Sequence, residues 1–285
     1  MNWLVLTGIS VVFRSIYGLM TKILSNKLKV SAYTQAVLLP LAAACIALLA
    51  SPLLGGLSFD TTRVSIVAVI LVVLGQGLGN IAYFEAIKNL TNSTAQITFS
   101  SILFFNTILS LLFLGLSLSI LNLIGVMVLA IAVISVSAGK IVLNKRGVLT
   151  MLLAAFLFAV FQLASAELSS QVSAATYLMI AYTGAAAVVF AIKGRIVIKD
   201  LRNTTNYKEI VVIPMLTALP SVGNFLFAYY AYRSAPSPAK VALLLTSQVV
   251  LTVFLSYIFL KEKDHLVRKV IASILVIVAA VLIKG

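Results

Sequence analysis

The sequence predicts an all-α integral membrane protein, with about ten transmembrane helices arranged as two inverted five-helix repeats. Of its 285 residues, 62% are hydrophobic and only 10% are charged, whereas about a quarter of a soluble domain is charged. The mean hydropathy is +1.15. The apolar runs are long enough to cross a bilayer, which needs roughly 20 residues. One pattern of short motifs is also written twice, about 145 positions apart.

The repeat is visible in two pairs of motifs that occur in the same order. The residues VSAYT at 30–34 match VSAAT at 172–176, and each opens a hydrophobic run. A Gly-Asn dipeptide lies inside an apolar run at 79–80 and again at 223–224. Because each copy holds an odd number of membrane-length runs, the second copy is predicted to lie inverted relative to the first.

Charged residues and turn residues divide the chain into the expected spans. These lie near residues 3–24, 31–51, 64–87, 93–116, 119–138, 147–168, 173–192, 210–232, 238–260 and 266–284. Five spans fall in each copy. We therefore expect one five-helix repeat at 1–143 and a second, inverted repeat at 144–285.

The basic loops predict the orientation in the membrane. Sixteen lysines and arginines fall on one face of the predicted bundle and four on the other. Basic loops stay in the cytoplasm, so both termini are expected outside, in the inner or plasma membrane of a prokaryote. The net charge of +14 is explained by these loops, and no nucleic-acid partner is expected. The expected partners are membrane lipids and a small molecule.

Arg14 is the most informative single residue. It follows Trp3 by eleven positions, which at about 1.5 Å per residue places it about 16 Å into the membrane. A charge there costs at least about 2.5 kcal/mol, so it should face a cavity or a partner. Ser10, Arg14, Tyr17 and Thr21 follow helical spacing, which suggests a planar cation that holds a carboxylate or phosphate with Tyr17 beside it. The alternative is a structural arginine satisfied by carbonyls of neighbouring helices.

Polar stripes also occur on the third and eighth spans. The third span holds Gln76, Asn80 and Tyr83 beside glycines that allow close helix packing, and the eighth holds Asn224. Amides donate to and accept from ligands, but hydrogen bonding between helices is an equally open interpretation. The twofold relation would bring Asn80 and Asn224 near one midplane site.

Further polar residues lie in the sixth and ninth spans. Gln162 and Gln248 are amides to which the same two interpretations apply. A set of hydroxyl residues is expected to serve packing or to bond the helix backbone. This set comprises Ser100, Ser101, Thr246 and Ser247.

The two five-span halves resemble the drug/metabolite transporter superfamily in its ten-helix EamA-like branch. So does the sequence at 259–262, FLKE, which ends the ninth span before one last hydrophobic span. The resemblance covers essentially the whole chain. It implies export or exchange of small metabolites through a cavity lined by the first, third, fourth, sixth, eighth and ninth helices. The chain departs from the family pattern at Leu116, where an acidic residue is usual, at Gln35, near the place of an arginine, and in its predicted external termini.

The carboxylates bear on how such transport would be energised. Only Glu85 and Glu167 lie within predicted spans. Glu85 precedes Lys88 by about one helical turn and is expected to form an interfacial ion pair with it. Glu167 is close to the end of the sixth span. Because neither is near the midplane, facilitated transport or exchange is preferred to a proton relay, with Glu167 and then Glu85 as the candidate proton sites.

These features favour a secondary transporter of a small polar or anionic metabolite, working by alternating access through the central cavity. Within transport, the alternative is export of cationic or amphipathic compounds. An intramembrane enzyme is disfavoured because the chain has no H-E-x-x-H helix, one histidine, His265, and one cysteine, Cys45. For the same reason we expect no metal site, no cofactor and no internal disulfide. A scaffold that transports nothing is disfavoured by the polar stripes.

Overall fold

Ten apolar helical segments make up the bundle. The computed structural model describes residues 2–284, apart from 29, 59–63, 115–118, 138–144, 205, 236–240 and 242–243. Within these residues, eight helical stretches are long and apolar enough to cross a membrane, and two shorter ones, Ile120–Val136 and Leu244–Phe259, bring the count to ten. No strand occurs in the described ranges. The predicted all-α membrane bundle is therefore confirmed.

The two halves contain corresponding helices: the fourth span of the first half is divided into α4 and α5, and part of the stretch before α11 in the second half lies outside the described residues. In the first half these are α1 (Trp3–Lys27), α2 (Ala32–Leu49), α3 (Ile66–Asn89), α4 (Asn92–Phe99), α5 (Ile102–Leu114) and α6 (Ile120–Ser137). In the second half they are α7 (Lys145–Gln171), α8 (Ala174–Asn203), α9 (Ile213–Ser234), α11 (Gln248–Phe259) and α12 (Leu266–Lys284). A short 3₁₀ turn, η1 (Ser51–Leu54), follows α2, and a π-helical turn, η2 (Lys208–Val212), leads into α9.

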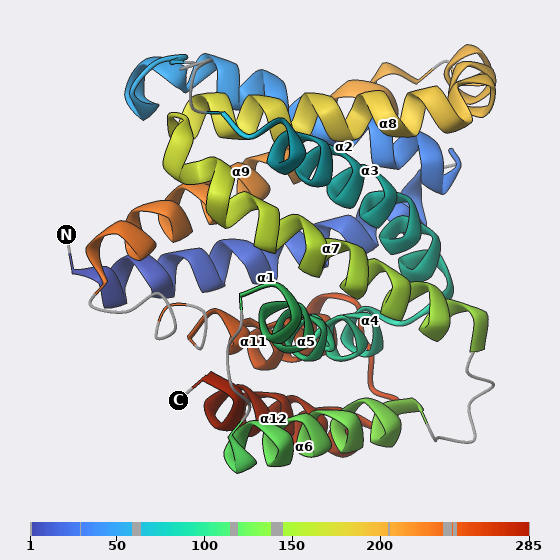
Figure 1. The fold of residues 1–285 in the computed structure, drawn as a ribbon. Coiled ribbons are helices and arrows are strands. Elements are labelled where there is room, and N and C mark those ends of the chain that lie inside the picture. The colour runs from blue at the N-terminus through green and yellow to red at the C-terminus, as the bar shows by residue number, and fades with distance from the viewer. Residues whose placement is uncertain are drawn as a thin grey trace.

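The bundle has two ends. Both chain termini lie on the left in Figure 1, and we call this the terminal end. The opposite side carries the connections from α1 to α2, α3 to α4, α8 to α9 and α11 to α12. We call it the basic end, because lysines and arginines gather there, among them Lys27, Lys88, Arg195, Lys199, Arg202, Lys208, Lys261, Lys263 and Arg268.

Contacts between helices show the repeat directly. Helix α3 of the first half packs on α7 of the second half, and the equivalent helix α9 of the second half packs on α1 of the first half. The contact of α5 with α7 corresponds in the same way to the contact of α11 with α1. The contact of α3 with α8 corresponds to the contact of α9 with α2. Two further contacts join equivalent helices, namely α2 with α8 and α6 with α12 (Figure 1). These contacts survive exchange of the halves, as an inverted repeat about a twofold axis requires.

The repeated Gly-Asn dipeptide has a packing role. A Cβ at Gly79 of α3 would lie 3.1 Å from the ring of Phe158 on α7, and a Cβ at Gly223 of α9 would lie 2.9 Å from the ring of Phe13 on α1. The two phenylalanines occupy equivalent places in the two halves. One contact between a glycine and a phenylalanine is therefore made twice, and in both cases glycine leaves the room that the ring fills.

The other repeated motif begins helices. At the start of α2 the Ser31 hydroxyl accepts a hydrogen bond from the Thr34 amide, and at the start of α8 Ser173 accepts one from the Thr176 amide, both at 3.2 Å. The Ser31 amide also donates to Asp200, near the end of α8, at 2.8 Å. The two N-caps consequently lie at opposite ends of the α2–α8 pair, as an inverted repeat places them.

The fourth and ninth spans are each interrupted near the middle, which the sequence did not predict. At the first break the Ser101 amide and hydroxyl both donate to the Thr98 carbonyl, at 3.1 and 2.7 Å. At the second break Ser247 donates in the same way to the Leu244 carbonyl, at 3.0 and 2.6 Å. Bonds to the third preceding residue tighten the turn into a 3₁₀ geometry. Helix then resumes at Ile102 and at Gln248.

Candidate functional site

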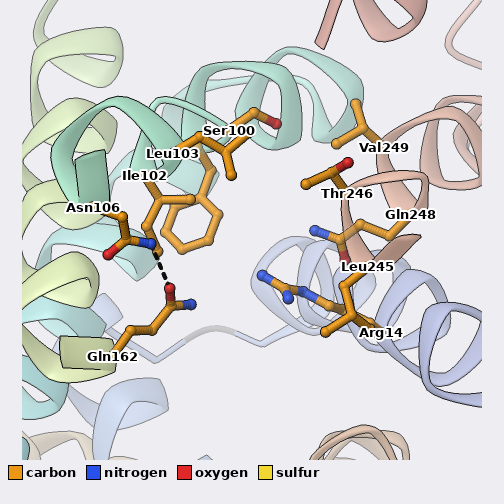
Figure 2. A pocket seen from close by; sticks show the side chains of 11 residues that line it. Arg14, Ser100, Ile102, Leu103, Asn106, Gln162, Leu245, Thr246, Gln248 and Val249 are labelled. Carbon is orange, nitrogen blue, oxygen red and sulfur yellow. Dashed lines mark hydrogen bonds between the residues drawn. The ribbon is translucent and has the colours of Figure 1, made fainter. Parts of the chain in front are cut away.

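A cavity lies where these two interruptions meet α1 and α7 (Figure 2). It is lined by Arg14, Phe99, Ser100, Ile102, Leu103, Asn106, Gln162, Leu245, Thr246, Gln248 and Val249. These residues come from the first, fourth, sixth and ninth spans, so both halves contribute. The volume of the cavity is about 70 Å³, small beside the roughly 300–1,000 Å³ of most ligand pockets. In this conformation the space is therefore narrow.

Arg14 supplies the charge in the cavity. It lies about halfway along α1, and Figure 2 shows its guanidinium group pointing into the space beside Gln248. The lining contains no aspartate or glutamate among the described residues. In a setting of low dielectric constant, a cation attracts an anion more strongly than it does in water. Arg14 therefore lines the cavity about halfway along α1, and its role in binding stays a prediction.

Three amides surround the same space. The Asn106 side chain of α5 donates to the Gln162 side chain of α7 at 2.7 Å, so this bond joins the two halves (Figure 2). Gln248 is the first residue of α11 after the interruption. Its backbone carbonyl accepts a hydrogen bond from the Ser15 hydroxyl of α1 at 3.2 Å. Amides offer both donors and acceptors to a polar ligand. Gln162 and Gln248 are thus predicted ligands that the structure brings to the cavity with Arg14.

Tyr83 stands behind the cavity wall rather than in it. Its hydroxyl accepts a hydrogen bond from the Gln96 side chain at 2.9 Å. Its ring meets the ring of Phe99, which lines the cavity, edge to face at 5.6 Å between centroids. Tyr17 packs against the large core cluster and does not line the cavity. Gln76 is buried and does not line the cavity, and its side-chain oxygen has no hydrogen-bond partner in the described part of the chain.

Asn80 and Asn224 are equivalent in the repeat but differ in their surroundings. The Ser10 hydroxyl of α1 donates to the side-chain oxygen of Asn224 at 2.9 Å and to the backbone carbonyl of Asn224 at 3.0 Å. In the second half the place of Ser10 is taken by Ala155, which cannot donate. Within the described part of the chain, the buried Asn80 side chain has no hydrogen bond. Asn224 therefore ties α9 to α1, whereas the Asn80 amide keeps its donors and acceptor for another partner.

The two carboxylates within the spans lie away from the cavity. The Tyr33 hydroxyl donates to Glu85 at 2.5 Å, and the Lys88 ammonium group donates to the Val30 carbonyl at 2.6 Å. The expected ion pair between Glu85 and Lys88 is therefore not formed, because each side chain finds a partner on or just before α2. Glu167 is exposed near the end of α7.

Three polar residues of the cavity lining were not predicted as ligands. Asn106 is the single amide in the apolar run of α5, a signal that sequence reasoning could have used. Ser100 and Thr246 were expected to serve packing or to bond the helix backbone. The Ser100 hydroxyl does donate to the Gln96 carbonyl, at 3.0 Å, and both residues also line the cavity. Ser101 and Ser247, the neighbouring pair, bond the helix backbone as expected.

The fold is shared with solved structures. In a search of these structures 26 chains match. One is a crystal structure of a protein with 15% sequence identity and a TM-score of 0.68, and the match covers 98% of this chain and 96% of that one. Identity this low shows the fold alone. A search of curated proteins found no match.

Two inverted halves of five spans, with a polar cavity at mid-depth between them, define a multi-pass membrane protein of the transporter type. The model of the EamA-like transporter family matches twice, at residues 1–138 and 145–285. The chain belongs to this family, and it is a membrane transporter of the drug/metabolite transporter type.

Proposed function

We propose that the protein is a secondary transporter of a small polar or anionic metabolite, which it moves by alternating access as the two halves rock about the central cavity. The observation that supports this most is Arg14, the charged residue that lines a cavity between two inverted halves. A charge at this depth is costly and is retained where it binds a substrate or an ion.

The chemistry of the lining favours a carboxylate or a phosphate as the recognised group. A guanidinium group binds either anion through two parallel hydrogen bonds. Gln248, Gln162 and Asn106 would orient the rest of the molecule through their amides. Four further predicted ligands do not line the cavity in this conformation, namely Tyr17, Gln76, Asn80 and Tyr83. In our proposal they join the site when the narrow cavity widens to admit substrate.

Facilitated transport or exchange is the preferred mode of operation. No carboxylate is among the described residues that line the cavity, so a proton cannot compete directly with substrate for a shared acidic group there. Glu167, followed by Glu85, is the fallback proton site. The proposal includes no enzymatic step and no cofactor.

The orientation is part of the same proposal. Basic loops are retained in the cytoplasm, so the basic end would face the cytoplasm and both termini the outside of a prokaryotic inner or plasma membrane. The repeats would divide at 143 and 144. A fluorescent protein that matures only in the cytoplasm should stay dark when fused after Gly285, and a bright fusion would reverse this orientation.

A ligand screen tests the function. Purified protein is heated with amino acids, organic acids, nucleotides, sugars and quaternary amines, because a ligand that binds the folded state raises the melting temperature. An organic anion should stabilise the wild type and Arg146→Ala, an exposed charge outside the cavity, but not Arg14→Ala. Stabilisation by cations instead of anions would contradict the proposal.

A further inference from the structure

The connection between α11 and α12 carries a carboxylate that reaches across to the other half. One Glu262 oxygen accepts a hydrogen bond from the Asn92 amide at 2.6 Å. The other accepts from the Ser93 amide at 3.1 Å and from the Ser93 hydroxyl at 2.7 Å. The Lys269 ammonium group of α12 forms an ion pair with the same oxygen at 3.3 Å. Four interactions therefore converge on one side chain.

Glu262 completes the N-terminal cap of α4. The first amides of a helix have no partner inside that helix. Thr91 accepts from the Thr94 amide, and Glu262 accepts from Asn92 and Ser93. A carboxylate at this position also interacts favourably with the positive end of the helix dipole. Two amides at the start of the fourth span, in the first half, are thus hydrogen-bonded by a residue of the second half.

The backbone around Glu262 is shaped to hold this position. Lys261 and His265, on either side, have φ values of 56° and 52°, in the left-handed region that residues other than glycine seldom adopt. The Glu262 amide donates to the Ser256 carbonyl at 3.3 Å, which folds the connection back over the end of α11. Backbone strain of this kind gathers at functional and switch regions.

Helices α4 and α11 each run from the cavity toward the basic end. They pack on each other, and their inner ends, at Phe99 and Gln248, line the cavity. Their outer ends meet at the carboxylate of Glu262, and Asn92 also donates to the Ser256 hydroxyl at 2.8 Å. Every residue of α4 from Asn92 to Thr98 is buried. Substrate could pass to the basic end only if these two helices separate.

Both helices bury polar atoms that lack partners. Among the residues that the structure describes, the side-chain oxygens of Asn92, Thr98 and Thr252 have no hydrogen-bond partner. Buried polar atoms are nearly always paired, so each exception calls for an explanation. Separation of α4 from α11 would bring water or substrate to these atoms, which suits the wall of a closed passage.

We propose that Glu262 is a positioning residue that keeps the basic end of the transport pathway closed, and that substrate can leave or enter there only after its bonds to α4 are released. This inference rests on the proposed alternating access. The equivalent position in the first half is Leu116, which lies outside the described residues and whose side chain has no acceptor atom. The resting protein should therefore favour the conformation that is open toward the terminal end.

Labelling of a cavity cysteine from each side of the membrane tests this proposal. The single native cysteine is removed as Cys45→Ser, and Thr246→Cys places a reporter in the cavity. A membrane-impermeant maleimide should label the reporter faster from the terminal end than from the basic end. Glu262→Ala should raise the labelling rate from the basic end by about tenfold or more, because a charged acceptor of several hydrogen bonds is lost. Glu262→Gln, which keeps one acceptor oxygen, should raise it less.

Asp264→Ala provides the matched control. Asp264 is an exposed carboxylate in the same connection and makes no hydrogen bond to α4 among the described residues, so this variant should label like the parent protein. Ser93→Ala removes one partner of Glu262 from the other side and should shift labelling in the same direction as Glu262→Ala, by less. Unchanged labelling from both ends in Glu262→Ala would overturn the proposal. So would unfolding of both Glu262→Ala and Ser93→Ala, because a gate must open without loss of the fold.

The labelling needs no substrate, so its outcome is separate from that of the ligand screen. If Glu262→Ala opens the basic end but no anion binds at Arg14, the gate stands and the substrate class is wrong. If anions bind at Arg14 but labelling is unaffected, the substrate class stands and the role of Glu262 is wrong.

Discussion

The two halves of the molecule share a packing frame but contain different polar residues. Gly79 receives Phe158 just as Gly223 receives Phe13, and the breaks in the fourth and ninth spans are closed by the same serine hydrogen bonds. A frame with this symmetry can open toward either end by equivalent motions. This equivalence is the physical basis of alternating access.

The polar residues break the symmetry. Arg14 lines the cavity, whereas its equivalent in the second half, Ala159, is fully buried in an apolar cluster. Asn224 is bonded by Ser10, whereas Asn80 has no such partner. In the proposed mechanism the frame and the site are under separate constraints: the motion requires two similar halves, whereas binding requires one strong anchor.

Leucine at either repeated glycine tests the shared frame and has the largest expected effect on stability. Gly79→Leu and Gly223→Leu each overpack a helix contact, so each should lower the free energy of unfolding by about 1–3 kcal/mol, and by similar amounts. The measurement is thermal unfolding of purified protein in detergent. Gly8→Leu is the control, because Gly8 has no atom within 4 Å of a built Cβ. Destabilisation by only one of the two variants would show that the halves are not packed alike.

Alanine at the two equivalent asparagines sharpens the difference between the halves. Asn224→Ala loses the bonds from Ser10 and should cost about 1 kcal/mol of stability. Asn80→Ala loses no bond in this conformation, so its melting temperature should change little while its affinity for substrate falls. Thermal unfolding with and without ligand measures both. The opposite assignment of effects would mean that Asn224, rather than Asn80, belongs to the binding site.

Gln248 tests whether the amides of the cavity contribute to binding. Gln248→Leu removes a donor and an acceptor beside Arg14 and should weaken the affinity for the stabilising anion by about two- to tenfold. Val249→Ile changes the same wall without loss of a polar group and should bind as the wild type does. Titration of the melting temperature with ligand gives both affinities, and equal values would remove Gln248 from the site.

Substitution of the two carboxylates within the spans should have the smallest effect on transport. Uptake into liposomes under a pH gradient should change by less than about twofold in Glu167→Gln and Glu85→Gln, because neither residue reaches the cavity. Loss of gradient-driven uptake in Glu167→Gln alone would identify the proton site and replace facilitated transport with proton coupling.

The helical spans could be predicted because the free energy of transferring side chains into the hydrocarbon core determines which segments cross the membrane. The third span was predicted at 64–87 and is observed at Ile66–Asn89. The position of Arg14 at a cavity could be predicted for the same reason, since a charge near the middle of a span is costly unless it faces a cavity or a polar partner.

Other features depend on partners far away in the chain. Asn80 and Asn224 are the same residue in the same motif, and only the serine or alanine on a distant helix gives them different roles. Serines also bond the backbone of unbroken helices, so Ser101 and Ser247 do not reveal a break by type alone. The Glu262 contacts require a connection that folds back across the two halves, which no local pattern encodes.

The most direct test of the central claim is the affinity of an organic anion, found by the ligand screen, for three forms of residue 14. The wild type should bind it most tightly, and Arg14→Lys should bind more weakly because an ammonium group lacks the planar fork. Arg14→Ala should lose at least about tenfold in affinity, as expected for removal of a charge-assisted hydrogen bond. Equal affinity in Arg14→Ala and the wild type would contradict the account.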